Sequence, residues 1–136
     1  MRSQCQRSTP LRILVVDDDP CICRLSSALL RRHGYEVDAA EDGAAAWEAL
    51  NADNYDLMIT DNNMPKVSGI ELLKKLHAAH GVLPVIMATG IPPAYEFGQN
   101  RWLQPAATLL KPYTVEEFLG TVKRVLRETD GIAAAA

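Results

Sequence analysis

The chain of 136 residues has few cysteines, and their spacing fits no disulfide or zinc framework. Cys5, Cys21 and Cys23 are an odd number, and C-x-C has no second pair of ligands at a zinc-binding spacing. Cys21 and Cys23 fall at an expected helix start, where a thiol pKa can be lowered, but small buried filler is the commoner role. We therefore expect free thiols rather than a redox centre.

Neither a basic stripe nor a long apolar run is present. The formal net charge is -3, from 14 Lys and Arg against 17 Asp and Glu, which argues against direct contact with nucleic acid. A bilayer span needs roughly 20 apolar residues, and no segment approaches that length. The start, MRSQCQRSTPLR, lacks the apolar core of a secretion signal. We expect a cytoplasmic protein that makes no membrane contact.

What the sequence does contain is the composition of one ordinary globular domain. Apolar residues make up 48% and charged residues 23%, and the length is enough to bury a core without disulfides or structural metal. We assign residues 11–128 to this domain. Residues 1–10 and 129–136 are expected to be flexible tails.

Short apolar runs alternate with amphipathic segments along the domain. Strands are expected at 12–16, 35–40, 55–60, 83–90 and 107–113. Helices are expected at 20–33, 44–51, 68–80 and 114–128, with a short irregular one among the prolines of 91–106. Five strands alternating with five helices predict one open α/β sandwich built from right-handed βαβ units.

Helix boundaries carry recognisable signals. Asp19 suits an N-cap before Pro20, and Gly34 suits the end of that helix. Ile22, Leu25 and Leu29 are expected to lie on one face of this helix. Two capping boxes are expected, formed by Ser68 with Glu71 and by Thr114 with Glu117.

Polar side chains collect where the expected strands end. They are Asp17 and Asp18 after the first strand, Asp61 after the third, Thr89 after the fourth and Lys111 in the fifth segment. In open parallel sheets the ligand site lies beyond the carboxyl ends of the strands, at the point where strand order reverses. We therefore expect these five side chains to meet.

Three neighbouring carboxylates repel one another and resist desolvation, and a bound divalent cation would relieve both costs. Oxygen ligands without Cys or His indicate Mg2+ rather than zinc. A carboxylate beside Mg2+ can attack phosphorus to give an acyl phosphate, and Asp61 is the predicted nucleophile. Lys111 would supply a positive charge to the phosphoryl group and Thr89 a hydroxyl hydrogen bond.

Five short motifs occur in order: VVDDD, EDG, DNNMPKVSG, MATG and LLKPY. With these motifs the chain resembles, over about residues 11–127, the receiver domain of bacterial two-component response regulators. The resemblance implies a flavodoxin-like open five-stranded parallel sheet of order 2-1-3-4-5, flanked by five helices. It also implies a signalling switch that takes a phosphoryl group from a histidine kinase or phosphotransfer protein and acts on a downstream protein, which the sequence does not identify.

The same resemblance implies a set of site residues. Mg2+ would be held by Asp18, Asp61 and the backbone carbonyl of Asn63, with Asp17 assisting through water. The bond between Lys111 and Pro112 is expected to be cis. Such a domain catalyses its own phosphorylation and dephosphorylation and is not a turnover enzyme.

Some positions depart from the family pattern or vary within it. Thr108 stands where many receivers have the Tyr or Phe that couples to the threonine, so the usual relay between these two side chains is not expected. Asn63 and Ile91 occupy places that tune the phosphoryl lifetime in the family. Three aromatic residues fall in the proline-bounded segment 91–106 and are expected to pack inward: Tyr95, Phe97 and Trp102.

Two other functions are compatible with parts of the pattern. Asp17 and Asp19 have the D-x-D spacing of phosphohydrolases that use an aspartate nucleophile, but Asp61 would then have no role. A docking module with the receiver fold but no useful phosphorylation is compatible with Thr108. The histidines His33, His77 and His80 fall in last turns of helices, where the dipole favours cations, and are not expected to bind metal.

Overall fold

The computed structural model describes residues 10–62, 69–79, 83–90 and 105–135. The elements are, in order, β1 (Arg12–Val16), α1 (Pro20–Arg32), β2 (Glu36–Ala40), α2 (Gly43–Ala52), β3 (Leu57–Asp61), α3 (Gly69–Ala79), β4 (Val85–Thr89), β5 (Ala107–Leu110) and α5 (Val115–Ala135). The helix expected within 91–106 falls almost entirely outside the described residues, as does Ser68 of one expected capping box. No helix in the described part of the chain has the length and hydropathy to cross a bilayer.

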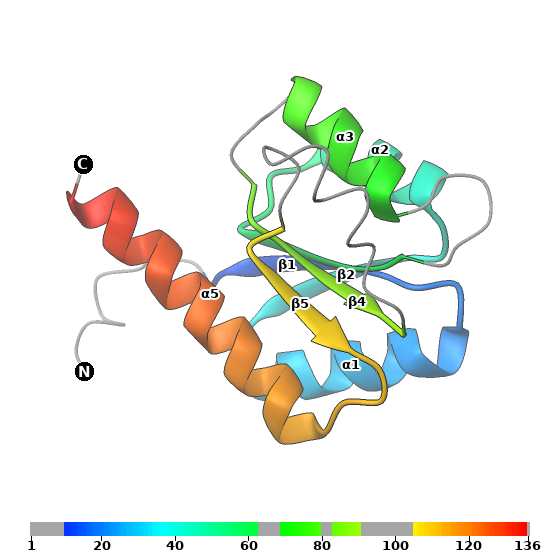
Figure 1. Ribbon diagram of the computed structural model, residues 1–136, viewed down its shortest axis with the longest axis horizontal. Coiled ribbons are helices and arrows are strands. Elements are labelled where there is room, and N and C mark those ends of the chain that lie inside the picture. Colours follow the sequence, from blue (N-terminus) through cyan, green and yellow to red (C-terminus); the bar gives the residue numbers. More distant parts are fainter. Residues whose placement is uncertain (1–9, 63–68, 80–82, 91–104, 136) are drawn as a thin grey trace.

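The five strands form one parallel sheet in the order β2-β1-β3-β4-β5, which confirms the predicted topology. Helices α2 and α3 cover one face of this sheet, and α1 and α5 cover the other (Figure 1). The strand order reverses at β1, so the carboxyl ends of β1 and β3 flank the crevice where α/β sheets bind ligands.

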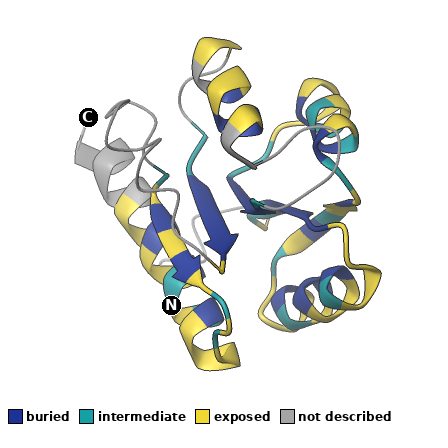
Figure 2. Ribbon diagram, turned by 45° about the vertical axis from the view of Figure 1, so that its right-hand side comes forward, coloured by how far each residue is buried: buried dark blue, intermediate teal, exposed yellow. Residues whose placement is uncertain are grey.

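The central strands are apolar because both of their faces are covered. In β1, Ile13 and Val15 belong to the core cluster that also contains residues of α1 and α5, whereas Leu14 and Val16 belong to the cluster with residues of α2 and α3. All five residues of β3 and of β4 are buried (Figure 2). Side chains alternate between the faces of a strand, so a continuous apolar run is what a sheet covered on both sides requires.

The ends of α1 follow the predicted signals. The Asp19 carboxylate accepts hydrogen bonds from the backbone N–H groups of Cys21 and Ile22 at 2.9 and 3.4 Å, and Pro20 is the first helical residue. Gly34 follows the helix at a φ of 92°, a conformation that side chains with a Cβ rarely adopt. The sequence analysis did not identify the N-cap of α2, where the Asp42 carboxylate accepts from Ala45 N–H at 2.8 Å.

Ile22, Leu25 and Leu29 lie together on one face of α1, as predicted, but the helix buries a different face against the sheet. Leu25 is 60% exposed, and the buried residues of the helix are Cys23, Ser26, Ser27 and Leu30. Small side chains let the helix lie close to the sheet, so the larger apolar residues are displaced to one side. They line a groove between α1 and the segment that joins β5 to α5.

The last strand and helix also differ from their predicted bounds. The strand ends at Leu110 instead of residue 113, and the cis bond between Lys111 and Pro112 is confirmed. The Thr114–Glu117 capping box is confirmed by reciprocal hydrogen bonds of 2.8 and 3.0 Å. The helix continues to Ala135, past the boundary predicted at 128. Alanine is the strongest helix former, and the run from Ala133 extends the helix despite Gly131.

A polar network joins the first three strands at the end of the sheet opposite their carboxyl termini. Arg12 donates to the Asp38 carboxylate through Nε and Nη2 at 3.2 and 2.8 Å, and the Tyr55 hydroxyl donates to the same oxygen at 2.8 Å. The Tyr55 hydrogen bond and then Arg12 lower the pKa of Asp38. Burial and the same hydrogen bond raise the pKa of Tyr55 to about 12. No sequence signal had indicated this network.

Replacing Tyr55 by Phe should lower the free energy of unfolding by about 1 kcal/mol at neutral pH, since one hydrogen bond to a partly exposed carboxylate is lost. The pKa of Asp38 is depressed in the folded state. Its contribution to the free energy of unfolding is therefore present above its ordinary pKa of 3.8 and fades as the pH falls. Urea unfolding of both proteins from pH 7 to pH 3 measures this. If the difference in free energy of unfolding between the two proteins grew toward acid pH, the stabilising role of the hydrogen bond from Tyr55 to Asp38 would be contradicted.

Replacing Ser27 by Ala should stabilise the protein. Among the described residues, the Ser27 hydroxyl oxygen is buried without a hydrogen-bond partner, and alanine removes that polar atom while improving helix propensity. The expected gain in the free energy of unfolding is about 1 kcal/mol, measured by thermal and urea unfolding. A loss of similar size would show that the hydroxyl is hydrogen-bonded in solution.

Candidate functional site

Three of the polar residues predicted to meet are brought together by two adjacent strand ends. Asp17 and Asp18 follow β1, and Asp61 is the last residue of β3. One carboxylate oxygen from each lies within 4.8 Å of the other two. The predicted acidic pocket is therefore confirmed for these three residues.

The backbone holds this pocket rigidly. Asp17 N–H donates to Ala40 at the end of β2, and Asn62 N–H donates to Ala88 in β4, both at 3.1 Å. The Asp17 carboxylate accepts from Asp19 N–H at 2.9 Å, which fixes its direction. Asp17 and the end of β3 that carries Asp61 are thus each attached to a neighbouring strand.

The three carboxylates differ in exposure. Asp17 and Asp61 are 6% and 5% exposed, whereas Asp18 is exposed. Burial raises the pKa of Asp17, and the charges of Asp61 and Asp18 raise it further, while the Asp19 hydrogen bond and Lys111 oppose the shift. The pocket therefore holds negative charge at an energetic cost that a cation would reduce.

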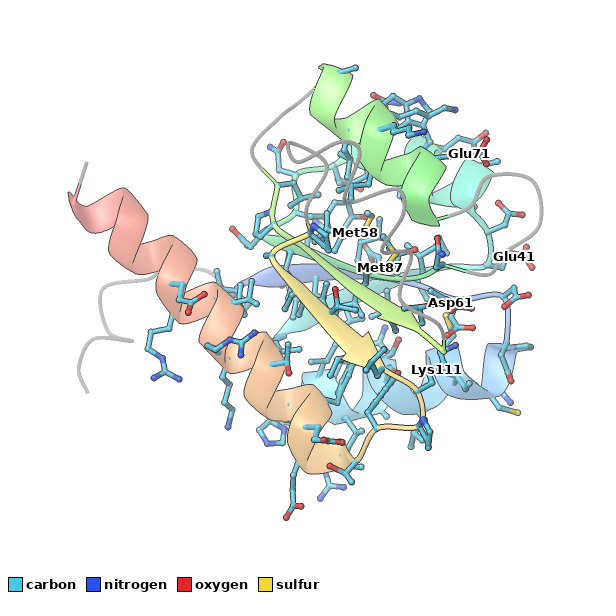
Figure 3. The ribbon with its side chains drawn as sticks, in the orientation of Figure 1. Glu41, Met58, Asp61, Glu71, Met87 and Lys111 are labelled. Carbon is cyan, nitrogen blue, oxygen red and sulfur yellow. The ribbon has the colours of Figure 1, made fainter. Side chains whose placement is uncertain are left out.

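Lys111 supplies one compensating charge. Its Nζ donates to Asp61 Oδ1 at 2.9 Å, and Figure 3 shows the two side chains directed toward each other. Burial alone would lower the pKa of Lys111, but the hydrogen bond and charge of Asp61 outweigh it, so the pKa is raised. Lys111 N–H also donates to the Thr89 carbonyl oxygen at 2.9 Å, which ties the residue to the end of β4.

Thr89 ends β4 one strand away from Asp61 and is 1% exposed. In the sheet register Asp61 pairs with Ala88, the residue before Thr89, and Thr89 pairs with Leu110, the residue before Lys111. The predicted threonine, nucleophile and lysine therefore occupy adjacent strand ends at one edge of the sheet.

Of the remaining predicted positions, some lie outside the described residues and others lie within them. Asn63, Ile91 and the three aromatic residues at 95, 97 and 102 lie outside the described residues. Thr108 lies on β5 with its side chain exposed. Cys21 and Cys23 are free, as predicted; Cys23 is buried, with its sulfur 3.6 Å from the Asp17 carbonyl oxygen.

Sequence reasoning missed an apolar groove of about 540 Å³ that adjoins the acidic pocket through Lys111. Its walls come from α1, from the turn before α5 and from the start of α5, and include Ile22, Leu25, Pro112, Tyr113 and Phe118. The signal available in the sequence was the apolar stripe of α1, which was predicted as one face of the helix but not as the wall of a groove.

Comparisons with known proteins agree with this geometry. The profile of the response regulator receiver domain family matches residues 13–123. RpaA of Synechocystis, described as a DNA-binding dual master transcriptional regulator, is 35% identical over 127 residues, which are 92% of this chain and 53% of RpaA. The chain spans about half the length of the curated relatives it matches.

Solved structures show the same likeness. The receiver domain protein of Methanospirillum hungatei superposes with a TM-score of 0.84 at 28% identity, covering 90% of this chain and 98% of that one. The response regulator TrrA of Thermotoga maritima, solved in complex with Mg2+ and BeF, has a TM-score of 0.75 at 33% identity and covers 85% and 98%. From its fold, its strand-end acids and these matches, the chain belongs to the response regulator receiver domain family and serves phosphorylation-dependent signalling.

Proposed function

We propose that Asp61 is the phosphoacceptor of this receiver domain and that it accepts a phosphoryl group with the help of Mg2+. The observation that supports this most strongly is the position of Asp61. It is a 5% exposed carboxylate on a rigid strand end, with two further carboxylates and a lysine within reach. A buried nucleophile with a fixed direction is suited to in-line attack on phosphorus.

The donor set suits Mg2+. Three carboxylate oxygens within 4.8 Å are hard ligands, and a small ion that keeps some of its waters can be held by such a set. Asp18 and Asp61 would bind the ion directly and Asp17 through water; Asn63, whose backbone carbonyl the family resemblance adds, lies outside the described residues. Bound there, the ion would neutralise charge on the transferring phosphoryl oxygens.

The transfer itself needs little from the protein beyond position and charge. An Asp61 oxygen attacks the phosphorus of the donor, the bond from phosphorus to the donor's nitrogen or oxygen breaks with its electron pair on the donor, and an acyl phosphate forms. Lys111, which now pairs with Asp61, can follow the negative charge to the phosphoryl oxygens, and the Thr89 hydroxyl can donate to them.

The expected donor is a histidine kinase or a histidine phosphotransfer protein, because this is the donor class of the family. The apolar groove beside Lys111 offers such a protein a contact surface that leads to Asp61. The phosphorylated domain would then act on a downstream protein. Direct contact with nucleic acid is not expected of this segment, although a relative such as RpaA is described as DNA-binding.

The geometry disfavours a phosphohydrolase of the D-x-D kind. In that reaction Asp19 would have to act as general acid and base, but its carboxylate caps α1 by accepting from two backbone N–H groups. Asp61, by contrast, sits in the middle of the acidic pocket. We therefore propose one phosphoryl group per chain and no steady turnover of phosphate esters.

Incubation with Mg2+ and a small acyl phosphate should add one phosphoryl group, seen by intact mass spectrometry, and Asp61→Asn should abolish it because the nucleophile is lost. Asp53→Asn is a matched control, since Asp53 is an exposed acid outside the pocket. Labelling that survives in Asp61→Asn but not in another acid variant would assign the phosphoacceptor elsewhere.

Replacing Asp17 by Asn should stabilise the metal-free protein at neutral pH by on the order of 1–2 kcal/mol, because one of three mutually repelling charges is removed. The pKa of Asp17 is raised in the folded state, so the folded wild type binds a proton at Asp17 more tightly than the unfolded chain does. The difference in free energy of unfolding between the variant and the wild type should therefore shrink as the pH falls.

Thermal unfolding with and without excess Mg2+ measures this directly. Mg2+ should raise the unfolding midpoint of the wild type and raise that of Asp17→Asn less, because a ligand that binds the folded state more tightly stabilises it more. An Asp17→Asn protein that is less stable than the wild type without metal would contradict the proposed repulsion.

A further inference from the structure

The position of Lys111 depends on a short turn between β5 and α5. Strand β5 ends at Leu110 and α5 begins at Val115, so four residues connect them. The turn is fixed at its start by the hydrogen bond from Lys111 N–H to Thr89 and at its end by the Thr114–Glu117 capping box. Between these two points, the large side chain that reaches inward is Tyr113.

Tyr113 is attached to the core by its ring. It is half-buried and stacks on Phe118 with ring centroids 5.9 Å apart and an interplanar angle of 14°. Phe118 is 2% exposed and belongs to the core cluster beneath α1 and α5. The stack therefore joins the turn to a part of the molecule that cannot move without disturbing the core.

Lys111 and Tyr113 also share one wall of the apolar groove. Burial raises the pKa of the Tyr113 hydroxyl, and the charge of Lys111 opposes that shift. The lysine side chain has a flexible four-carbon stem with many rotamers. Its ammonium group is held in one direction only if neighbouring groups fill the space that the other rotamers would need.

We propose that Tyr113 is a positioning residue for Lys111: its ring, held by Phe118, fills the space beside the lysine stem and directs Nζ to Asp61. The proposal rests on the proposed role of Asp61 as phosphoacceptor. Tyr113 does not touch the transferring group and acts only through Lys111. The ring is what matters, so the hydroxyl is dispensable.

Three variants separate this role from a general effect on stability. Tyr113→Leu removes the ring, Tyr113→Phe keeps it, and Tyr35→Leu removes an equivalent ring that packs against the same core cluster near the amino end of β2. Phosphorylation by a small acyl phosphate with Mg2+ should be about tenfold slower in Tyr113→Leu, since misplacing a charged group by roughly 1 Å can cost up to about a hundredfold. Tyr113→Phe and Tyr35→Leu should keep the wild-type rate.

A double-mutant comparison tests whether the effect passes through Lys111. In a Lys111→Ala background, adding Tyr113→Leu should cause no further loss of rate, because the residue that Tyr113 positions is already gone. A second loss of the same size would overturn the proposal, as would an equal slowing by Tyr35→Leu.

The ammonium group of Lys111 can be followed without any phosphorylation. Its ¹⁵N signal should be detectable in wild type and in Tyr113→Phe, where the ion pair with Asp61 slows proton exchange, and should be lost or shifted in Tyr113→Leu. An unchanged signal in Tyr113→Leu would refute the positioning role even if Asp61 proves not to be phosphorylated. If the signal is present in the wild type and lost in Tyr113→Leu but no phosphoryl group is accepted, the proposed function fails and the positioning role stands.

Discussion

Three carboxylates held close together at one edge of a sheet are the constraint on which the site depends. Asp17 and Asp61 are buried, and the three carboxylate oxygens lie within 4.8 Å, so the fold must support a concentration of negative charge that water alone does not relieve. Lys111 offsets part of it at 2.9 Å from Asp61. The negative charge that remains would attract a divalent cation, and in the proposed function the lysine is the group that can move when a phosphoryl group arrives.

The sheet provides the rigidity that this arrangement needs. Its three inner strands are covered on both faces, and the core clusters on the two sides are built from alternate residues of the same strands. A strand packed in this way cannot shift without disturbing both layers. The acids at the ends of these strands therefore remain close although they repel one another. Their repulsion lowers the free energy of unfolding, and burial of the hydrophobic core offsets that loss.

The alternation of strands and helices and the meeting of the described acids could be predicted because both follow local rules, whereas the strand order came from the family resemblance. Apolar runs such as 55–60 are long enough to show burial on both faces, and an acid that ends such a run is conspicuous. Boundaries and packing faces were less predictable. The apolar stripe of α1 did not reveal which face the helix buries, because its large residues, such as Leu25, lie to one side of the small ones that contact the sheet. The contacts that join Arg12 to Asp38 and Tyr113 to Phe118 depend on pairing and packing geometry, which no local pattern encodes.

Paramagnetic broadening by Mn2+, which shares the oxygen ligands of Mg2+, tests most directly whether the strand-end acids form a cation site. Titration of the ¹⁵N-labelled protein with Mn2+ should broaden the amide signals of residues 16–19 and 60–62 before all others, and this broadening should reach saturation. Excess Mg2+ should restore the signals. The acids Asp38, Asp53 and Asp56 lie at the other end of the sheet and provide an internal comparison. Broadening centred on those residues, or none that saturates, would contradict the account.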